Sequence, residues 1–143
     1  MAVADPLAGP VTYVRMALGH ELYALAVEAV LEVADLGDVT PLPGAPRAVL
    51  GVCNLRGNVL PVVDVRNLLG TQDAAATAQR LVVTERGGRR VGLAVDAVID
   101  VGPLPGTPET TDADHLSGAV IVQGALVGFL ALDSLLAAVE AST

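Results

Sequence analysis

The chain has 143 residues, a length that fits one ordinary domain able to bury a hydrophobic core without disulfide bonds or metals. Eight arginines, no lysines and sixteen acidic residues give a formal net charge of −8, which disfavours binding to nucleic acid or to anionic lipid. The single Cys53 excludes an internal disulfide bond and fits a reducing compartment, so the cytoplasm is the expected location.

The start of the chain and its longest apolar stretch indicate neither export nor a membrane span. Residues 1–11 lack the basic region and long apolar core of a secretory signal, and Pro6 and Pro10 mark them as a loose leader. Residues 118–132, GAVIVQGALVGFLAL, are shorter than the ~20 residues that a membrane-spanning helix needs, and Gln123-Gly124 interrupts them. We therefore expect two strands and a turn there, without direct membrane insertion.

The first half of the chain is typical of short strands joined by tight turns. Gly19-His20 supplies the turn of a first hairpin, and the prolines of TPLPGAP at 40–46 enforce a loop. Asp64 ends a strand directly before VRNLL, where its carboxylate can cap a helix that Gly70 ends. The predicted elements are strands at 12–18, 21–27, 30–34, 51–55 and 59–64 and a helix at 65–69.

The second half has the same character. Residues 71–79, TQDAAATAQ, carry no strand pattern and are the expected linker. Gly87-Gly88 joins the next pair of strands, a polar loop runs to Ser117, and Asp133 and Ser134 can cap a final helix. The predicted elements are strands at 81–85, 91–95, 98–101, 119–122 and 126–130 and a helix at 132–140.

The two halves resemble each other in sequence. AVEAVLEV at 26–33 matches AVDAVIDV at 94–101, a displacement of 68 positions (94 against 26), and TPLPGAP has a partner in GPLPGTP at 102–108. A duplicated unit of about seventy residues is the simplest explanation. We therefore predict a mostly β fold over 12–143, in which the repeats 12–70 and 80–140 build two small five-stranded β-barrels.

Arg56 stands out within the repeat. It lies between Asn54 and Gly57, residue types that favour a tight turn between strands, so we expect its side chain at the tip of a hairpin. Its counterpart one unit later is Gln123. The turn is repeated and the charge is not, which indicates that this arginine serves something other than the fold.

The sequence offers few groups for catalysis or for binding metals and cofactors. His20 lies in a predicted turn, His115 in a polar loop and Cys53 in an apolar strand, and Asp112 and Asp114 beside His115 are best interpreted as a solvated loop. No GxGxxG or GxxxxGK[ST] phosphate-binding signature occurs. An enzyme would require His20, His115 or Cys53 to converge in one cleft at the barrel junction. We expect no catalytic residue, cofactor or metal.

What remains is the surface. Apolar residues make up 52% of the chain and only three residues are aromatic, so two small barrels can bury many aliphatic side chains and still expose a stripe of them. Exposed apolar stripes usually mark protein–protein interfaces.

Four segments together resemble the CheW family of bacterial chemotaxis coupling proteins. They are YALAVEAVLEV, TPLPGAP, GVCNLRGNVLPVVDVRNLLG and VGLAVDAVIDV, and the resemblance extends from about Tyr13 to Leu136. It implies two SH3-like β-barrels without catalytic activity. It also implies an adaptor in two-component signal transduction that bridges the cytoplasmic hairpin tip of a chemoreceptor and the regulatory domain of the histidine kinase CheA, recruited to membrane-associated receptor arrays.

The same resemblance implies a receptor-binding surface. Arg56 matches the arginine of the NLRG motif on the receptor-facing side, and Val30 and Val98 match aliphatic positions that line a groove between the barrels; Gly51 is grouped with them. We expect Glu32 to pair with Arg56, because an arginine set against apolar strands loses hydration and favours a nearby carboxylate.

One alternative is a CheW-like scaffold in another kinase array, such as one that controls surface motility or development. Another is a fragment of the kinase, whose regulatory domain has the same fold; the starting methionine and the length favour a free-standing adaptor. Cys53 and the abbreviated loop at 103–117 depart from the family pattern.

Overall fold

The computed structural model describes residues 11–70, 78–104, 109–111 and 113–141. The predicted leader 1–11 and linker 71–79 lie mostly outside the described residues, and Asp112 lies wholly outside them. The elements are β1 (Tyr13–Leu18), β2 (Glu21–Ala26), the short 3₁₀ helix η1 (Val27–Ala29), β3 (Val30–Asp35), β4 (Val49–Leu55), β5 (Asn58–Asp64), α1 (Val65–Leu69), β6 (Arg80–Arg86), β7 (Arg89–Val95), β8 (Ala97–Gly102), β9 (Leu116–Val122), β10 (Ala125–Leu130) and α2 (Leu132–Ala141).

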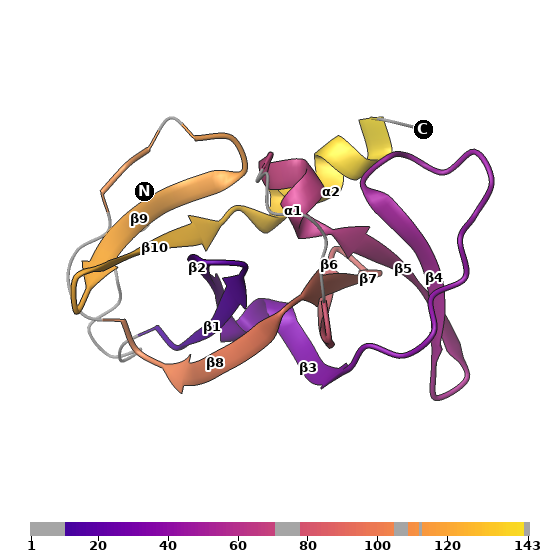
Figure 1. Ribbon diagram of the computed structural model, residues 1–143, viewed down its shortest axis with the longest axis horizontal. Helices are drawn as coiled ribbons and strands as arrows, with labels where there is room; N and C mark the ends of the chain where they lie inside the picture. Colours follow the sequence, from indigo (N-terminus) through magenta and orange to yellow (C-terminus); the bar gives the residue numbers. More distant parts are fainter. Residues whose placement is uncertain (1–10, 71–77, 105–108, 112, 142–143) are drawn as a thin grey trace.

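The prediction of a mostly β fold with two five-stranded sheets and short helices is confirmed (Figure 1). Every predicted strand and helix is present, and β9 begins three residues earlier than expected (116 against 119). The predicted strand end at Val27 is wrong, because Val27 begins η1.

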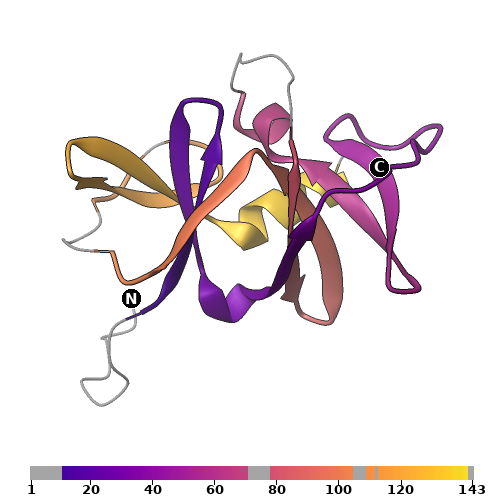
Figure 2. The ribbon, with the colours of Figure 1, turned by 60° about the horizontal axis from the view of Figure 1, so that its bottom comes forward.

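The two sheets do not coincide with the two halves of the sequence, so the expectation that the five strands of each half build one barrel is wrong. Sheet A has the order β8-β1-β2-β10-β9 and sheet B the order β3-β6-β7-β5-β4. The first hairpin of each half therefore joins the later strands of the other half, as Figure 2 shows for the indigo hairpin β1–β2 beside the salmon β8. Parallel pairs, β2 with β10 and β7 with β5, hold the exchanged hairpins in place.

The exchange follows the sequence repeat. Replacing each strand of sheet A by its counterpart one repeat unit away gives the order of sheet B. Equivalent turns also share their backbone conformation: Arg56 and Gln123 have φ of 52° and 51°, and Gly57 and Gly124 have φ of 85° and 82°. Two successive residues with positive φ are typical of a type I′ hairpin turn. The duplication is therefore a property of the structure as well as of the sequence.

Among the described residues, three apolar clusters hold the fold together. One lies within sheet A around Val127 and Phe129, and one within sheet B around Leu60 and Val62. The third and largest lies between the sheets, because the exchanged hairpins contribute side chains to it from β1, β2, β6 and β7. We call the region of this cluster between the sheets the junction. Along these hairpins, alternate side chains face the cluster within one sheet and the junction, which explains why the hairpin sequences are apolar at nearly every position.

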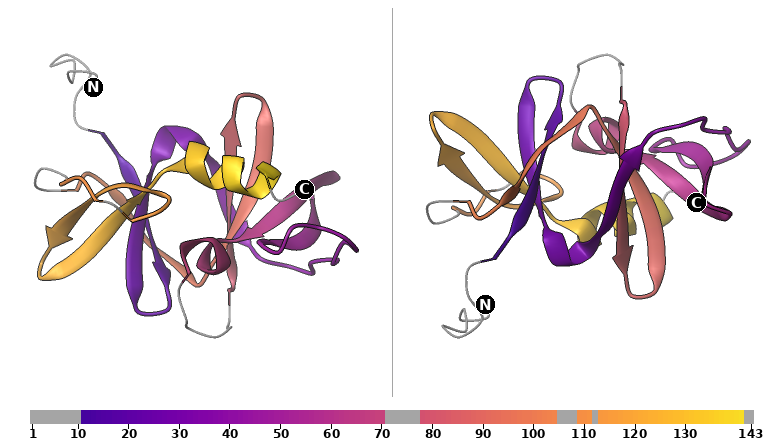
Figure 3. Two further views of the ribbon diagram at one scale, coloured as in Figure 1. Left: turned by 90° about the horizontal axis from the view of Figure 1, so that it is seen from above. Right: turned by 90° about the horizontal axis from the view of Figure 1, so that it is seen from below.

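Both helices belong to the junction. The Asp64 side chain accepts a hydrogen bond from the Arg66 backbone N–H at 3.1 Å, which confirms the predicted cap of α1. α2 runs from the end of β10 across the junction (Figure 3), where it buries Leu132, Leu135 and Leu136 in the cluster between the sheets. In the part of the chain that the structure describes, no helix has the length and apolar character needed to span a membrane.

Candidate functional site

Arg56 lies at the tip of the β4–β5 hairpin, as the turn residues predicted. The Asn54 side chain accepts a hydrogen bond from the Gly57 N–H at 2.8 Å, which stabilises the turn locally. The Arg56 side chain is 72% exposed. The turn therefore presents a guanidinium to solvent on a defined backbone.

Glu32 pairs with Arg56, which confirms the expected contact. Arg56 Nη1 donates to Glu32 Oε1 at 2.9 Å and Arg56 Nη2 donates to Glu32 Oε2 at 2.5 Å, so the pair is bidentate. Glu32 lies on β3 and Arg56 follows β4, and these strands are opposite edges of sheet B. The pair thus connects the two edges of the sheet.

We had expected the pair to form because Arg56 would lose hydration. That reason is wrong, because the exposed Arg56 side chain keeps most of its hydration. An exposed ion pair contributes about 1 kcal/mol or less to stability. What the bidentate geometry provides is orientation, because it limits the directions in which the guanidinium can point.

Val30 and Val98 occupy equivalent places in the two sheets. Val30 begins β3 and Val98 lies near the start of β8, and both are partly buried against the cluster between the sheets. The residues that follow them, Leu31 and Ile99, are each 49% exposed. The junction therefore carries matched aliphatic positions on two edge strands, one of which also carries Glu32.

Gly51 has a structural reason to be glycine. It lies at a register shift of β4 with a φ of 149°, and a Cβ there would lie 2.1 Å from the Thr40 carbonyl oxygen. That carbonyl accepts the Val52 N–H at 2.9 Å, which fixes the proline loop on the edge of β4. Gly51 thus lets a loop approach the strand closely, and its proposed part in receptor binding stays a prediction.

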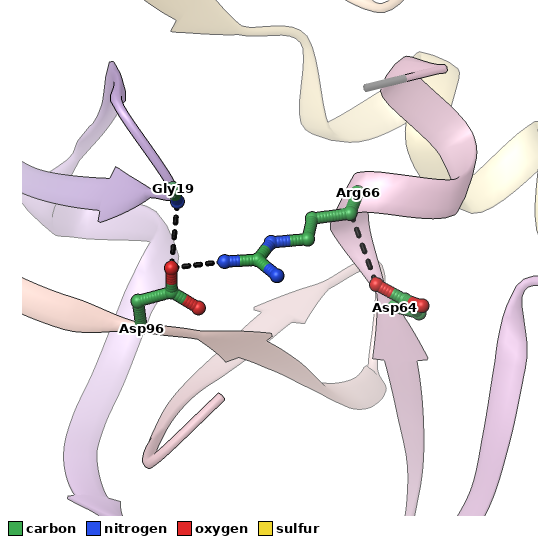
Figure 4. Close-up of polar contacts among 4 residues, drawn as sticks. All are labelled: Gly19, Asp64, Arg66 and Asp96. Carbon is green, nitrogen blue, oxygen red and sulfur yellow. Dashed lines mark hydrogen bonds and ion pairs between the residues drawn. The ribbon is translucent and has the colours of Figure 1, made fainter. Parts of the chain in front are cut away.

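A polar contact at the sheet junction was missed by the sequence reasoning. Asp96, in the connection between β7 and β8, accepts the Gly19 N–H from the β1–β2 turn at 2.6 Å and forms an ion pair with Arg66 of α1 (Figure 4). The two side chains are only 20% and 12% exposed. This contact connects the turn of a sheet A hairpin to sheet B and its helix.

The groups considered for catalysis lie apart. Cys53 packs in the cluster within sheet B, His20 is exposed in the β1–β2 turn of sheet A, and His115 Nδ1 lies 2.7 Å from the Ser134 hydroxyl at the start of α2. Within residues 11–70, 78–104, 109–111 and 113–141, no group of three His, Cys, Asp or Glu side chains is placed to hold a metal ion. The convergence that an enzyme would require does not occur among these three residues.

Burial raises the pKa of the Cys53 thiol. Because the thiolate is the reactive form, we expect Cys53 to react slowly with a disulfide reagent such as DTNB at neutral pH and much faster once the chain is unfolded in denaturant. Release of the coloured thiolate measures both rates. Equal rates in the folded and unfolded chain would contradict the buried assignment.

Comparison with known proteins adds relatives. The family model described as the CheW-like domain matches residues 12–140. The chain is 34% identical over 126 residues to the chemotaxis protein CheW of Rhizobium meliloti (strain 1021), with 82% of this chain and 81% of that protein covered. It is 36% identical over 105 residues to protein FrzA of Myxococcus xanthus, with 68% and 66% covered.

A solved structure also matches. The crystal structure of the scaffolding protein TtCheW from Thermoanaerobacter tengcongensis has a TM-score of 0.77 and 26% sequence identity to this chain, and the match covers 91% of this chain and 90% of that one. This coverage includes both sheets, in agreement with the expected pair of SH3-like barrels.

Proposed function

The chain belongs to the CheW family, and from that premise we propose that it is a non-catalytic adaptor that couples the cytoplasmic tips of chemoreceptors to the histidine kinase CheA. Its similarity to a chemotaxis protein and to a scaffolding protein supports the general role of a scaffold in chemotaxis. The separate positions of Cys53, His20 and His115 are consistent with a protein that works by binding.

The observation that carries the receptor assignment is the oriented guanidinium of Arg56. It is exposed at a hairpin tip, it is held by Glu32, and Glu32 shares β3 with Val30 and the exposed Leu31. A receptor hairpin is helical, and its apolar ridge would lie against the aliphatic residues of the junction, with Arg56 fixing register at the rim. Apolar burial would supply most of the affinity and the charge most of the specificity.

The kinase is the second partner in this proposal, through the regulatory domain of CheA. The adaptor would act in the cytoplasm and reach the membrane through the receptors. Ligand binding to the receptor would then change the activity of the kinase through the adaptor that connects them.

Removing the Arg56 side chain tests the receptor assignment. In Arg56→Ala, we expect the dissociation constant for a purified cytoplasmic fragment of a chemoreceptor from the same host to rise at least about tenfold, while the free energy of unfolding changes by less than about 1 kcal/mol. Isothermal titration calorimetry and urea denaturation measure the two quantities.

Arg90→Ala is the matched control, because Arg90 is also exposed and also pairs with a carboxylate, that of Glu85 at 2.8 Å. We expect this variant to bind the receptor fragment like the parent. Equal losses of affinity in the two variants would mean that general charge, and not the position of Arg56, is responsible.

A further inference from the structure

Two edge strands each carry a β-bulge at an aliphatic residue. The pairing of β3 with β6 shifts in register at Leu31, and the pairing of β8 with β1 shifts in register at Ile99. Leu31 and Ile99 are equivalent one repeat unit apart (31 + 68), and both are half-exposed. Bulges on edge strands redirect side chains and are frequent beside functional sites. The two halves therefore present equivalent aliphatic side chains at the surface.

Arg15 of β1 fixes the residue that follows the bulge in β8. Its Nε donates to Asp100 Oδ1 at 2.9 Å and its Nη2 donates to Asp100 Oδ2, so the pair is bidentate. The hydrogen bonds from Arg15 hold the pKa of the Asp100 carboxyl below its usual range. Because Asp100 directly follows Ile99, the ion pair limits the positions that the bulge can take.

The same arrangement in sheet B belongs to the proposed receptor surface. There Glu32 directly follows Leu31 and is held by two hydrogen bonds from Arg56. Glu32 corresponds to Asp100 (32 + 68), but the arginines differ in origin, since Arg56 lies at a hairpin tip and Arg15 on the neighbouring strand. The duplication accounts for the equivalent acids, whereas each half supplies its arginine separately. This favours a common use for the two bulges.

The bulge in β8 is continuous with the proposed receptor surface. Val98 directly precedes Ile99 and packs against the cluster between the sheets, as Val30 does directly before Leu31. β3 and β8 both lie along the lower side of the molecule in Figure 1. An apolar helical ridge laid along the junction beside Arg56 would therefore meet both edge strands.

We propose that Ile99 is a receptor contact in sheet A and that Arg15 is a positioning residue for it, acting through Asp100. The inference rests on the proposed function and names a second place where the receptor hairpin binds. An aliphatic side chain on a fixed bulge suits an apolar helical ridge. Contacts on both sheets would fix the direction of the receptor helix across the adaptor, which a single contact at Arg56 cannot do.

Isoleucine methyl groups provide the test, because Ile99 and Ile121 are the two isoleucines of the chain. Ile121 lies exposed on β9 of the same sheet, so its ¹³C-labelled δ1 methyl group is an internal control for that of Ile99. Titration with a purified, unlabelled cytoplasmic fragment of a chemoreceptor from the same host should shift the Ile99 signal and leave the Ile121 signal in place. Ile99→Val, which removes one of the two signals, assigns them.

Arg15→Ala and Arg90→Ala test the positioning role. Arg90 also pairs with an acid on the neighbouring strand, Glu85, where the pairing of β6 with β7 has no shift in register. Arg15→Ala should move the Ile99 signal of the free protein and raise the dissociation constant for the receptor fragment at least about threefold. Its dissociation constant for the regulatory domain of CheA should stay at the parental value. Arg90→Ala should behave like the parent in all three measurements.

Arg56→Ala, measured in the same titration, separates failure of this inference from failure of the proposed function. The inference is overturned, and the function kept, if the parent binds the fragment through Arg56 while its Ile99 signal stays in place or its Ile121 signal moves equally. It is also overturned if Arg15→Ala binds the fragment like the parent. A parent protein that does not bind the fragment overturns both.

Discussion

Replacing Gly51 with alanine is expected to lower the free energy of unfolding by about 3 kcal/mol or more, which is a large part of the stability of an ordinary domain. An alanine Cβ would lie 2.1 Å from the Thr40 carbonyl oxygen and 2.9 Å from the Pro41 Cα, and backbone atoms cannot move aside cheaply. The φ of 149° adds strain, because residues with a Cβ rarely adopt it. Relief would require the loop to leave β4 and break the bridge between Thr40 and Val52.

Gly37→Ala is the control for this variant, because a Cβ at Gly37 meets no atom within 4 Å. It should change the unfolding free energy by less than about 1 kcal/mol. Urea denaturation of both variants, combined with receptor binding measured well below the unfolding midpoint, separates two roles of Gly51. A Gly51→Ala protein with parental stability and reduced binding would contradict the structural account and favour direct receptor contact.

Removing the Asp96 carboxylate should have the second large effect. In Asp96→Ala, the Arg66 guanidinium would stay mostly buried without its counter-ion, and the Gly19 N–H would lose its acceptor. Leaving a charge in such a place costs several kcal/mol, and because this pair is partly exposed we expect about 2–3 kcal/mol. Denaturation with guanidinium chloride should show a lower unfolding midpoint, since sheets A and B lose a contact that joins them.

Asp35→Ala provides the comparison. Asp35 also pairs with an arginine, Arg80, on neighbouring strands, but its side chain is 86% exposed. Its removal should cost less than about 1 kcal/mol. If Asp96→Ala and Asp35→Ala destabilise the protein equally, the contact between Asp96 and Arg66 contributes no more than an exposed ion pair. The sheets would then be held together by the apolar cluster alone.

The sequence was sufficient to predict the elements because each strand is short, apolar and bounded by a turn residue. It could not predict the exchange of hairpins. The two repeats carry equivalent strands, so β1–β2 could complete either its own half or the other, and local patterns are the same in both cases. The three-dimensional structure distinguishes them, because β1 pairs with β8 and β2 pairs with β10.

The sequence also predicted only part of the candidate site. Arg56 and Glu32 were identified from a charged residue that breaks the repeat and from the family motif, although the hydration argument for their pairing failed. Arg66 and Asp96 were missed because they lie 30 positions apart and meet only through the fold. A signal was present in the repeat itself, since Asp96 corresponds to Glu28 in the best-matched segment and an acidic residue recurs there.

The most direct test of the proposed role is capture of partners from a lysate of the protein's own host, with the parent protein and Arg56→Ala immobilised in parallel and the bound proteins identified by mass spectrometry. We predict that the parent retains a CheA-like kinase together with chemoreceptors, and that Arg56→Ala retains the kinase and selectively loses the receptors. Recovery of neither class by the parent, or equal recovery of receptors by both proteins, would contradict the account.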